Sequence, residues 1–89
     1  MALKINKVYK EAIMQETKII LKDMIAIRDF VQQVILLNYE VDLVQGRYTV
    51  DAKSIMGIFA LDTLSPITLV AHTNNAEEFF EKIKNIIVE

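Results

Sequence analysis

The chain has no cysteine, no tryptophan, two glycines and a single proline among its 89 residues. Without cysteine it has neither a disulfide framework nor a thiolate metal site, which suits a reducing compartment. The apolar runs, of which Val34–Leu37 is among the longest, are far shorter than the roughly 20 residues that span a bilayer. The sequence therefore predicts a cytoplasmic protein that does not insert into membranes.

An excess of positive charge is also lacking, because ten basic and twelve acidic residues give a formal net charge of −2. Nucleic-acid and anionic-membrane binders usually carry a basic patch or stripe. We therefore expect the partners to be proteins or small ligands, and no nucleic acid.

The chain contains enough apolar residues to form the core of one globular domain, since 53% of its residues are hydrophobic and 25% are charged. Residues 1–16 mix apolar and charged side chains with an imperfect helical stripe. We interpret them as a peripheral N-terminal extension, helical or frayed, or as a leader upstream of Met14. The domain itself is predicted to cover residues 17–89.

A strand and a helix are predicted to open this domain. Ile19 and Leu21 alternate with lysines in residues 17–22, which predicts a strand with both apolar side chains directed inward. Apolar residues then recur at helical spacing to near residue 38, and Asp23 precedes them as the predicted N-cap. Ile35 and Leu36 widen the apolar stripe of this helix, either as a contact surface or through tight packing, and we favour packing.

A hairpin is predicted next, from residues 40–44 and 48–50 around the turn Gln45-Gly46-Arg47. Its inward face is expected to consist of Val41, Leu43, Tyr48 and Val50.

Three more elements are predicted to complete the domain. Ser54 is the expected start of a helix over residues 55–61, with Ile58 and Leu61 in the core. A fourth strand follows at residues 67–72, and Asn75 is the predicted cap of a last helix. The apolar face of that helix is expected to comprise Ala76, Phe79, Phe80, Ile83, Ile86 and Ile87.

This element order, βαββαβα, predicts an α+β fold in which three helices cover one face of a four-stranded, mainly antiparallel sheet. Two architectures share the order. One is the open-faced sandwich of small phosphocarrier proteins, and the other is the ferredoxin-like arrangement of ligand-binding modules such as ACT domains. The position of the last strand separates them, since the sandwich places it between the first and the second.

The stretch Ala52-Lys53-Ser54-Ile55-Met56-Gly57 favours the sandwich. It resembles the segment around the regulatory serine of HPr, the histidine-containing phosphocarrier protein family of the bacterial sugar phosphotransferase system. Phe30-Val31 is similar to the family's first-helix core pair, and Glu40-Val41 to the start of its second strand. The resemblance runs from about Thr17 to the end and implies an HPr-like open-faced sandwich.

The same resemblance exposes a departure at the family's active site. The family has its active histidine at the start of the first helix, followed two residues later by arginine and then by proline, and these positions hold Asp23, Ile25 and Ala26. Asp23 offers no imidazole to accept a phosphoryl group, and Ile25 offers no cation to stabilise it. The resemblance therefore implies a degenerate active site without catalytic residues, and we predict a protein that is not an enzyme. Asp23 is interpreted as a cap rather than as a site of aspartyl phosphate.

The remaining polar candidates are weaker. His72, the only histidine, ends the predicted fourth strand and is interpreted as a strand-end residue rather than a phosphoryl carrier. A lone histidine with scattered carboxylates has no metal-ligand spacing, so neither a metal nor another cofactor is predicted. Arg28 is expected to pair with Asp29 or with solvent.

At position 54 the chain has a serine, as the resemblance to the family implies, and its hydroxyl can be phosphorylated. We predict regulatory phosphorylation there by an HPr-type kinase, with Ile55, Met56 and Phe59 as an apolar patch that a regulator or other protein contacts. A regulatory, protein-binding member of the phosphotransferase system is thus the first interpretation, and a ferredoxin-like (ACT-type) ligand-binding or interaction module is the alternative. A third, transfer of phosphate from phosphoenolpyruvate through Enzyme I to sugar permeases, would require a phosphohistidine.

Overall fold

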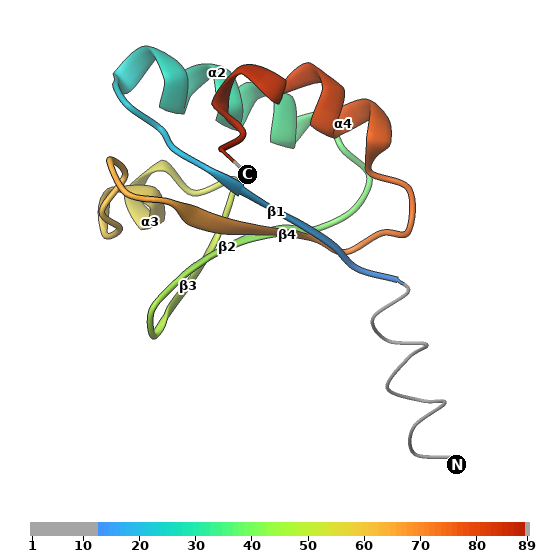
Figure 1. Cartoon of the computed structure of the whole chain (residues 1–89), viewed down its shortest axis with the longest axis horizontal. Coiled ribbons are helices and arrows are strands. Elements are labelled where there is room, and N and C mark those ends of the chain that lie inside the picture. Colours follow the sequence, from blue (N-terminus) through green and yellow to red (C-terminus); the bar gives the residue numbers. More distant parts are fainter. Residues whose placement is uncertain (1–12, 89) are drawn as a thin grey trace.

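The structure, a computed structural model, describes residues 13–88. Its strands are β1 (Gln15–Ile19), β2 (Val41–Gln45), β3 (Tyr48–Asp51) and β4 (Ile67–Ala71), and its helices are α2 (Met24–Ile35), α3 (Ile55–Phe59), α4 (Glu77–Lys82) and the short 3-10 helix η1 (Lys84–Ile86). Figure 1 shows α2 and α4 on one side of the sheet, with α3 near the start of α2. The described residues thus have the predicted order of elements, and no helix among them is long and apolar enough to cross a membrane.

The four strands form one sheet in the order β1-β4-β2-β3, and every pairing is antiparallel. Leu69 of β4 lies opposite Thr17 of β1 on one side and Leu43 of β2 on the other. The last strand therefore lies between the first and the second, which confirms the α+β open-faced sandwich. The ferredoxin-like alternative is wrong, because it requires a different strand order.

The outer edge of β1 is covered at its carboxyl end by the last described residues of the chain. The N–H of Ile20 donates to the carbonyl of Ile86 at 3.0 Å, and the N–H of Val88 donates to the carbonyl of Lys18 at 2.8 Å. An isolated bridge joins Ile19 and Ile87 between these two bonds. The carboxyl end of β1 is thus paired on its outer side as well, which shortens the exposed edge of the sheet.

The core lies between the sheet and the helices, and the predicted inward residues Ile19, Leu21, Val41 and Leu43 are fully buried there. Alternation along β4 likewise buries Ile67, Leu69 and Ala71, and α2 contributes Ile27, Phe30, Val31 and Val34. Burying a large aliphatic side chain stabilises a fold by about 1.5–3 kcal/mol. This layer is therefore what fixes α2 and α4 on the sheet.

Several boundaries and faces differ from the prediction. β1 begins at Gln15, two residues before the predicted strand and domain start, and most of the predicted extension, residues 1–16, lies outside the described residues. Tyr48 does not belong to the inward face of the hairpin, since its side chain is 55% exposed. It is the first residue of the edge strand β3 and lies next to the tight turn at Gly46, whose φ is +61°.

The helix ends show two further corrections. α2 ends at Ile35 rather than near residue 38, and Ile35 and Leu36 are 59% and 76% exposed, so the expected tight packing of these two residues is wrong. Asn75 is not a cap, because Ala76 occupies the N-cap position of α4 without a side-chain hydrogen bond of its own. The N–H of Ala76 donates instead to the side chain of Gln15, at 2.8 Å.

Candidate functional site

Asp23 begins α2 as predicted. Its backbone is extended, with φ −159° and ψ 175°, and its Oδ1 accepts a hydrogen bond from the N–H of Ala26 at 2.8 Å. Its backbone carbonyl also accepts from Ile27 at 3.1 Å. The carboxylate therefore occupies the positive end of the helix, where an added anionic group would otherwise gain from the free amides.

No cation faces this helix start from the next residues of α2. Ile25, at the position where the resemblance places an arginine, is 62% exposed and apolar. The first cation along the helix, Arg28, forms an exposed ion pair with Asp29 at 3.3 Å, as predicted. The start of α2 thus holds its own backbone in place, with the carboxylate of Asp23 on the amide of Ala26 and the apolar side chain of Ile25 beside it.

Ser54 begins α3, and its geometry is that of an N-cap. Its backbone is extended, with φ −99° and ψ 105°, and its Oγ accepts from the N–H of Gly57 at 2.9 Å. The preceding turn is closed by a bond from the N–H of Ser54 to the carbonyl of Asp51 at 2.9 Å. The hydroxyl is therefore fixed at the helix start, on a half-buried residue.

Gly57 leaves room for this contact. A Cβ built at Gly57 would lie 3.2 Å from the Oγ of Ser54 and 3.1 Å from the Cβ of Val50, both tighter than ordinary van der Waals contact. The missing side chain thus lets the first turn of α3 approach the hydroxyl and β3 closely.

Helix α3 separates buried from exposed apolar residues. Ile58 is fully buried and Leu61 is 8% exposed, which confirms both as core residues. Ile55, Met56 and Phe59 are 38%, 77% and 47% exposed. The three residues predicted as a partner-binding patch therefore lie at the surface, next to Ser54, and α3 contacts α2.

Lys53 joins the turn before α3 to the start of β2. Its Nζ lies 3.1 Å from Oε1 of Glu40 and 3.6 Å from Oδ2 of Asp51. The hydrogen bond to Glu40, together with the charge of Asp51, raises the pKa of Lys53 above its usual value. These pairs are exposed and individually weak, and they lie on the residues that directly precede Ser54 in the chain and on Glu40 before β2.

His72 follows β4 directly, as a strand-end residue, and does not meet Asp23 or Ser54 in any hydrogen bond. Its Nε2 lies 2.8 Å from Oδ2 of Asp42, and its backbone N–H donates to the carbonyl of Glu40 at 2.9 Å. Within residues 13–88, no group of three or more histidine, cysteine, aspartate or glutamate side chains is arranged to hold a metal ion. His72 thus forms a side-chain hydrogen bond with Asp42 at the end of β4, as a strand-end residue.

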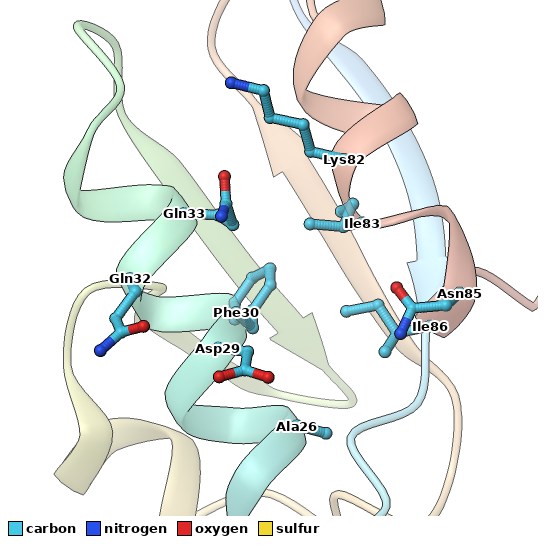
Figure 2. A pocket seen from close by; sticks show the side chains of 9 residues that line it. All are labelled: Ala26, Asp29, Phe30, Gln32, Gln33, Lys82, Ile83, Asn85 and Ile86. Carbon is cyan, nitrogen blue, oxygen red and sulfur yellow. The ribbon is translucent and has the colours of Figure 1, made fainter.

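Two hollows between α2 and α4 were not predicted from the sequence. One, of about 300 Å³, is shown in Figure 2 and is lined by Ala26, Asp29, Phe30, Gln32, Gln33, Lys82, Ile83, Asn85 and Ile86. In Figure 2, Phe30 and Ile83 point toward each other across its floor, while polar side chains form its rim. The other, of about 420 Å³, adjoins it around Tyr39 and Glu78. Neither includes Asp23 or Ser54.

The comparisons with known proteins bear on the fold. No model of a protein family matches the chain, and no curated protein matches it. Among solved structures, the chain is similar to the crystal structure of a phosphocarrier protein HPr from Bacillus anthracis str. Ames, with 27% sequence identity and a TM-score of 0.65. The match covers 84% of this chain and 98% of that one. The likeness and the strand order together show that this chain has an HPr-like fold, which suggests a relation to the phosphocarrier family.

Proposed function

We propose that this chain is an HPr-related protein of the phosphotransferase system that cannot carry phosphohistidine and acts in the cytoplasm by binding other proteins. The observation that carries the proposal is the 2.8 Å bond between the Asp23 carboxylate and the N–H of Ala26. A negative charge already satisfies the helix start at which an HPr-like carrier would present its imidazole. The proposed role is therefore regulatory rather than enzymatic.

We further propose that phosphorylation of Ser54 switches this binding. The Oγ of Ser54 is fixed 2.9 Å from the N–H of Gly57, so a phosphate on it would remain beside the amides of the first turn of α3. Such a position accepts a dianion without melting the helix. The carboxylates of Asp51 and Glu40 would repel the phosphate. The ammonium group of Lys53, which pairs with both carboxylates, would offset this repulsion.

The surface offered to a partner consists of Ile55, Met56 and Phe59. Each is at least 38% exposed although large and apolar, and such residues gathered beside a modification site favour a protein contact. A phosphate on Ser54 would add charge at the rim of this patch. We expect the modified and unmodified forms to bind different proteins, or one protein with different affinity.

The test is incubation with an HPr-type kinase and ATP, followed by mass spectrometry. One phosphate per chain is expected, absent from Ser54→Ala and retained in Ser65→Ala, whose hydroxyl lies in the turn before β4. The proposal of a Ser54 switch would be abandoned if no phosphoserine formed or if phosphate persisted in Ser54→Ala.

A second arm tests the loss of carrier chemistry. Incubation with phosphoenolpyruvate and Enzyme I is expected to leave the chain unlabelled. Acid-labile phosphohistidine, which could form here only at His72, would contradict the proposal.

A further inference from the structure

The two hollows between α2 and α4 adjoin and form one groove. Gln33 of α2 and Lys82 of α4 line both of them, and in Figure 2 these two side chains stand on opposite sides at one end of the first hollow. Leu36, which lines the second hollow, is 76% exposed, and Tyr39 in the same hollow is only half-buried. The groove therefore has apolar surface that nothing in residues 13–88 covers.

The amino-terminal segment, residues 1–12, joins the described domain at one end of this groove. The side chain of Gln15 accepts a hydrogen bond from the N–H of Ala76 at 2.8 Å and donates one to the carbonyl of Asn74 at 3.3 Å. Asn75, between these two residues in the chain, lines the second hollow. Two residues separate the segment from Gln15, so the segment is attached close to the end of the groove that the second hollow forms.

The sequence of residues 1–12 has the period of an amphipathic helix. Its apolar residues recur at i, i+4, i+7 and i+11, as Met1, Ile5, Val8 and Ala12. Leu3 and Lys7 fall on the opposite face of such a helix. Twelve residues in a helix extend about 18 Å, and the wall of the groove from Ala26 to Leu36 of α2 extends about 15 Å. The segment is therefore long enough to lie along the whole groove.

The charges of the segment and of the domain are opposite in sign. Residues 1–12 contain three lysines and one glutamate, whereas residues 13–88 contain seven basic and ten acidic residues. Glu77 and Glu78 lie in the first turn of α4, close to the attachment point, and neither forms an ion pair within the described chain. Lys82 lies one turn further along the same wall of the groove. The end of the groove nearest the attachment point is therefore acidic, which favours a basic segment.

We propose that residues 1–12 form an amphipathic helix that packs in the groove between α2 and α4 of the same chain, with its apolar face on Leu36 and Tyr39. Its carboxyl end then lies in the second hollow and its amino end in the first. A helix of this length is marginal in water by itself, so the packing also supplies its stability. The docked segment closes the groove to other proteins and leaves Ser54 and α3 uncovered, because neither hollow includes them.

The test is paramagnetic relaxation on the full chain, which has no cysteine of its own. A nitroxide on Asn6→Cys is expected to broaden the amide signals of Gln33, Leu36 and Glu78 in the groove walls. The signal of Gly46 should stay sharp, since the β2–β3 turn points away from both helices in Figure 1. Signals broadened evenly over the domain, or only next to Gln15, would overturn the proposal.

A mixing experiment separates docking within one chain from binding to a second copy. Spin-labelled chain is mixed with isotope-labelled chain that has no nitroxide, and the groove signals of the isotope-labelled chain are expected to stay sharp. Broadening in the mixture would show that the groove takes the segment of another copy, which contradicts the proposal.

Val8→Asp decides whether the apolar face of the segment makes the contact. In the spin-labelled chain it should lower the ratio of docked to undocked segment by about tenfold or more, since one buried aliphatic side chain is lost. Leu3→Asp makes the same kind of change on the opposite face and is the matched control, with unchanged broadening of the groove signals. Leu36→Lys should act as Val8→Asp does, and α2 itself should persist because a cation favours its carboxyl end. Equal effects of Val8→Asp and Leu3→Asp, or no effect of Leu36→Lys, would refute the proposed packing.

Discussion

Replacing Ser54 by alanine should measure how much the start of α3 depends on one hydroxyl. The substitution removes the 2.9 Å bond from the N–H of Gly57 to the Oγ and leaves that amide half-buried without its acceptor. Loss of a serine N-cap costs about 1 kcal/mol, within a range of about 0.5–2 kcal/mol. For a domain of this size, 1 kcal/mol lowers the melting temperature by about 4–8 °C. With a urea m-value of about 1 kcal/mol/M, the unfolding midpoint falls by about 1 M.

Two comparisons make this measurement specific. Ser54→Asp keeps a side-chain acceptor and should remain within about 0.5 kcal/mol of the original chain, because aspartate and serine cap helices about equally well. Ser65→Ala removes a hydroxyl that donates to Oδ2 of Asp62 at 2.8 Å in an exposed turn and should cost less than about 0.5 kcal/mol. The reasoning fails if Ser54→Ala costs no more than Ser65→Ala, or if the m-value changes and shows that the denatured state has been altered instead.

Three other features can be tested by substitution: the turn at Gly46, the hydrogen bond of Gln15 and the pKa of Tyr39. The φ of Gly46 is +61°, and an added Cβ would meet no atom within 4 Å. Gly46→Ala should therefore lower the free energy of unfolding in urea by about 1–2 kcal/mol through backbone strain alone. Asparagine tolerates this conformation better than alanine, so an equal cost for Gly46→Asn would argue against strain. Gln15→Ala removes the 2.8 Å bond from the N–H of Ala76; we expect a loss of about 1 kcal/mol and faster amide exchange at Ala76, and unchanged exchange would show that the bond does not hold α4. Burial, with a smaller effect of the Glu78 charge, raises the pKa of Tyr39 above 10.0. The resulting stability is present below pH of about 10 and is lost as the pH rises through the raised pKa, because the unfolded chain releases the phenolic proton first. An NMR titration should show a lower Tyr39 pKa in Glu78→Gln.

Local patterns were sufficient to predict the two helix starts that matter most here. Asp23 and Ser54 each accept a bond from an amide three residues later, a contact that depends only on the chain around it. The strand alternation of Ile19, Val41 and Leu43 was equally informative, since one face of an open sheet is buried and the other is not. These features follow from sequence because their causes are close in sequence.

The wrong predictions have causes that are distant in sequence. Tyr48 alternates correctly with Val50, but its exposure depends on where the helix layer ends over the edge strand. Asn75 has the chemistry of a cap, yet the amide at the start of α4 is satisfied by Gln15, 61 positions earlier. Ile35 fits an apolar stripe, and only the position of α2 on the sheet shows that it faces water.

The position of the hollows between α2 and α4 could not be predicted from the spacing of apolar residues in the sequence either. Their walls come from two helices that are separated by residues 36–76. Phe30, Phe79, Ile83 and Ile86 belong to predicted apolar faces, whereas the polar residues of the walls do not. A groove of this kind is a product of helix-on-sheet packing, so the sequence of one helix does not specify it.

The pairing of β1 with late parts of the chain has a consequence for synthesis. β1 is translated before its neighbours in the sheet, which are β4 on one side and Ile86–Val88 on the other. The β2–β3 hairpin is closed by two residues and can form while the chain is still growing, whereas β1 must wait for partners about 50 or more residues later. Until then Ile19 of β1 and Leu21, which follows the strand, have no complete core to enter. The nascent chain is therefore expected to need shielding of its first strand until nearly all of the described domain has been translated.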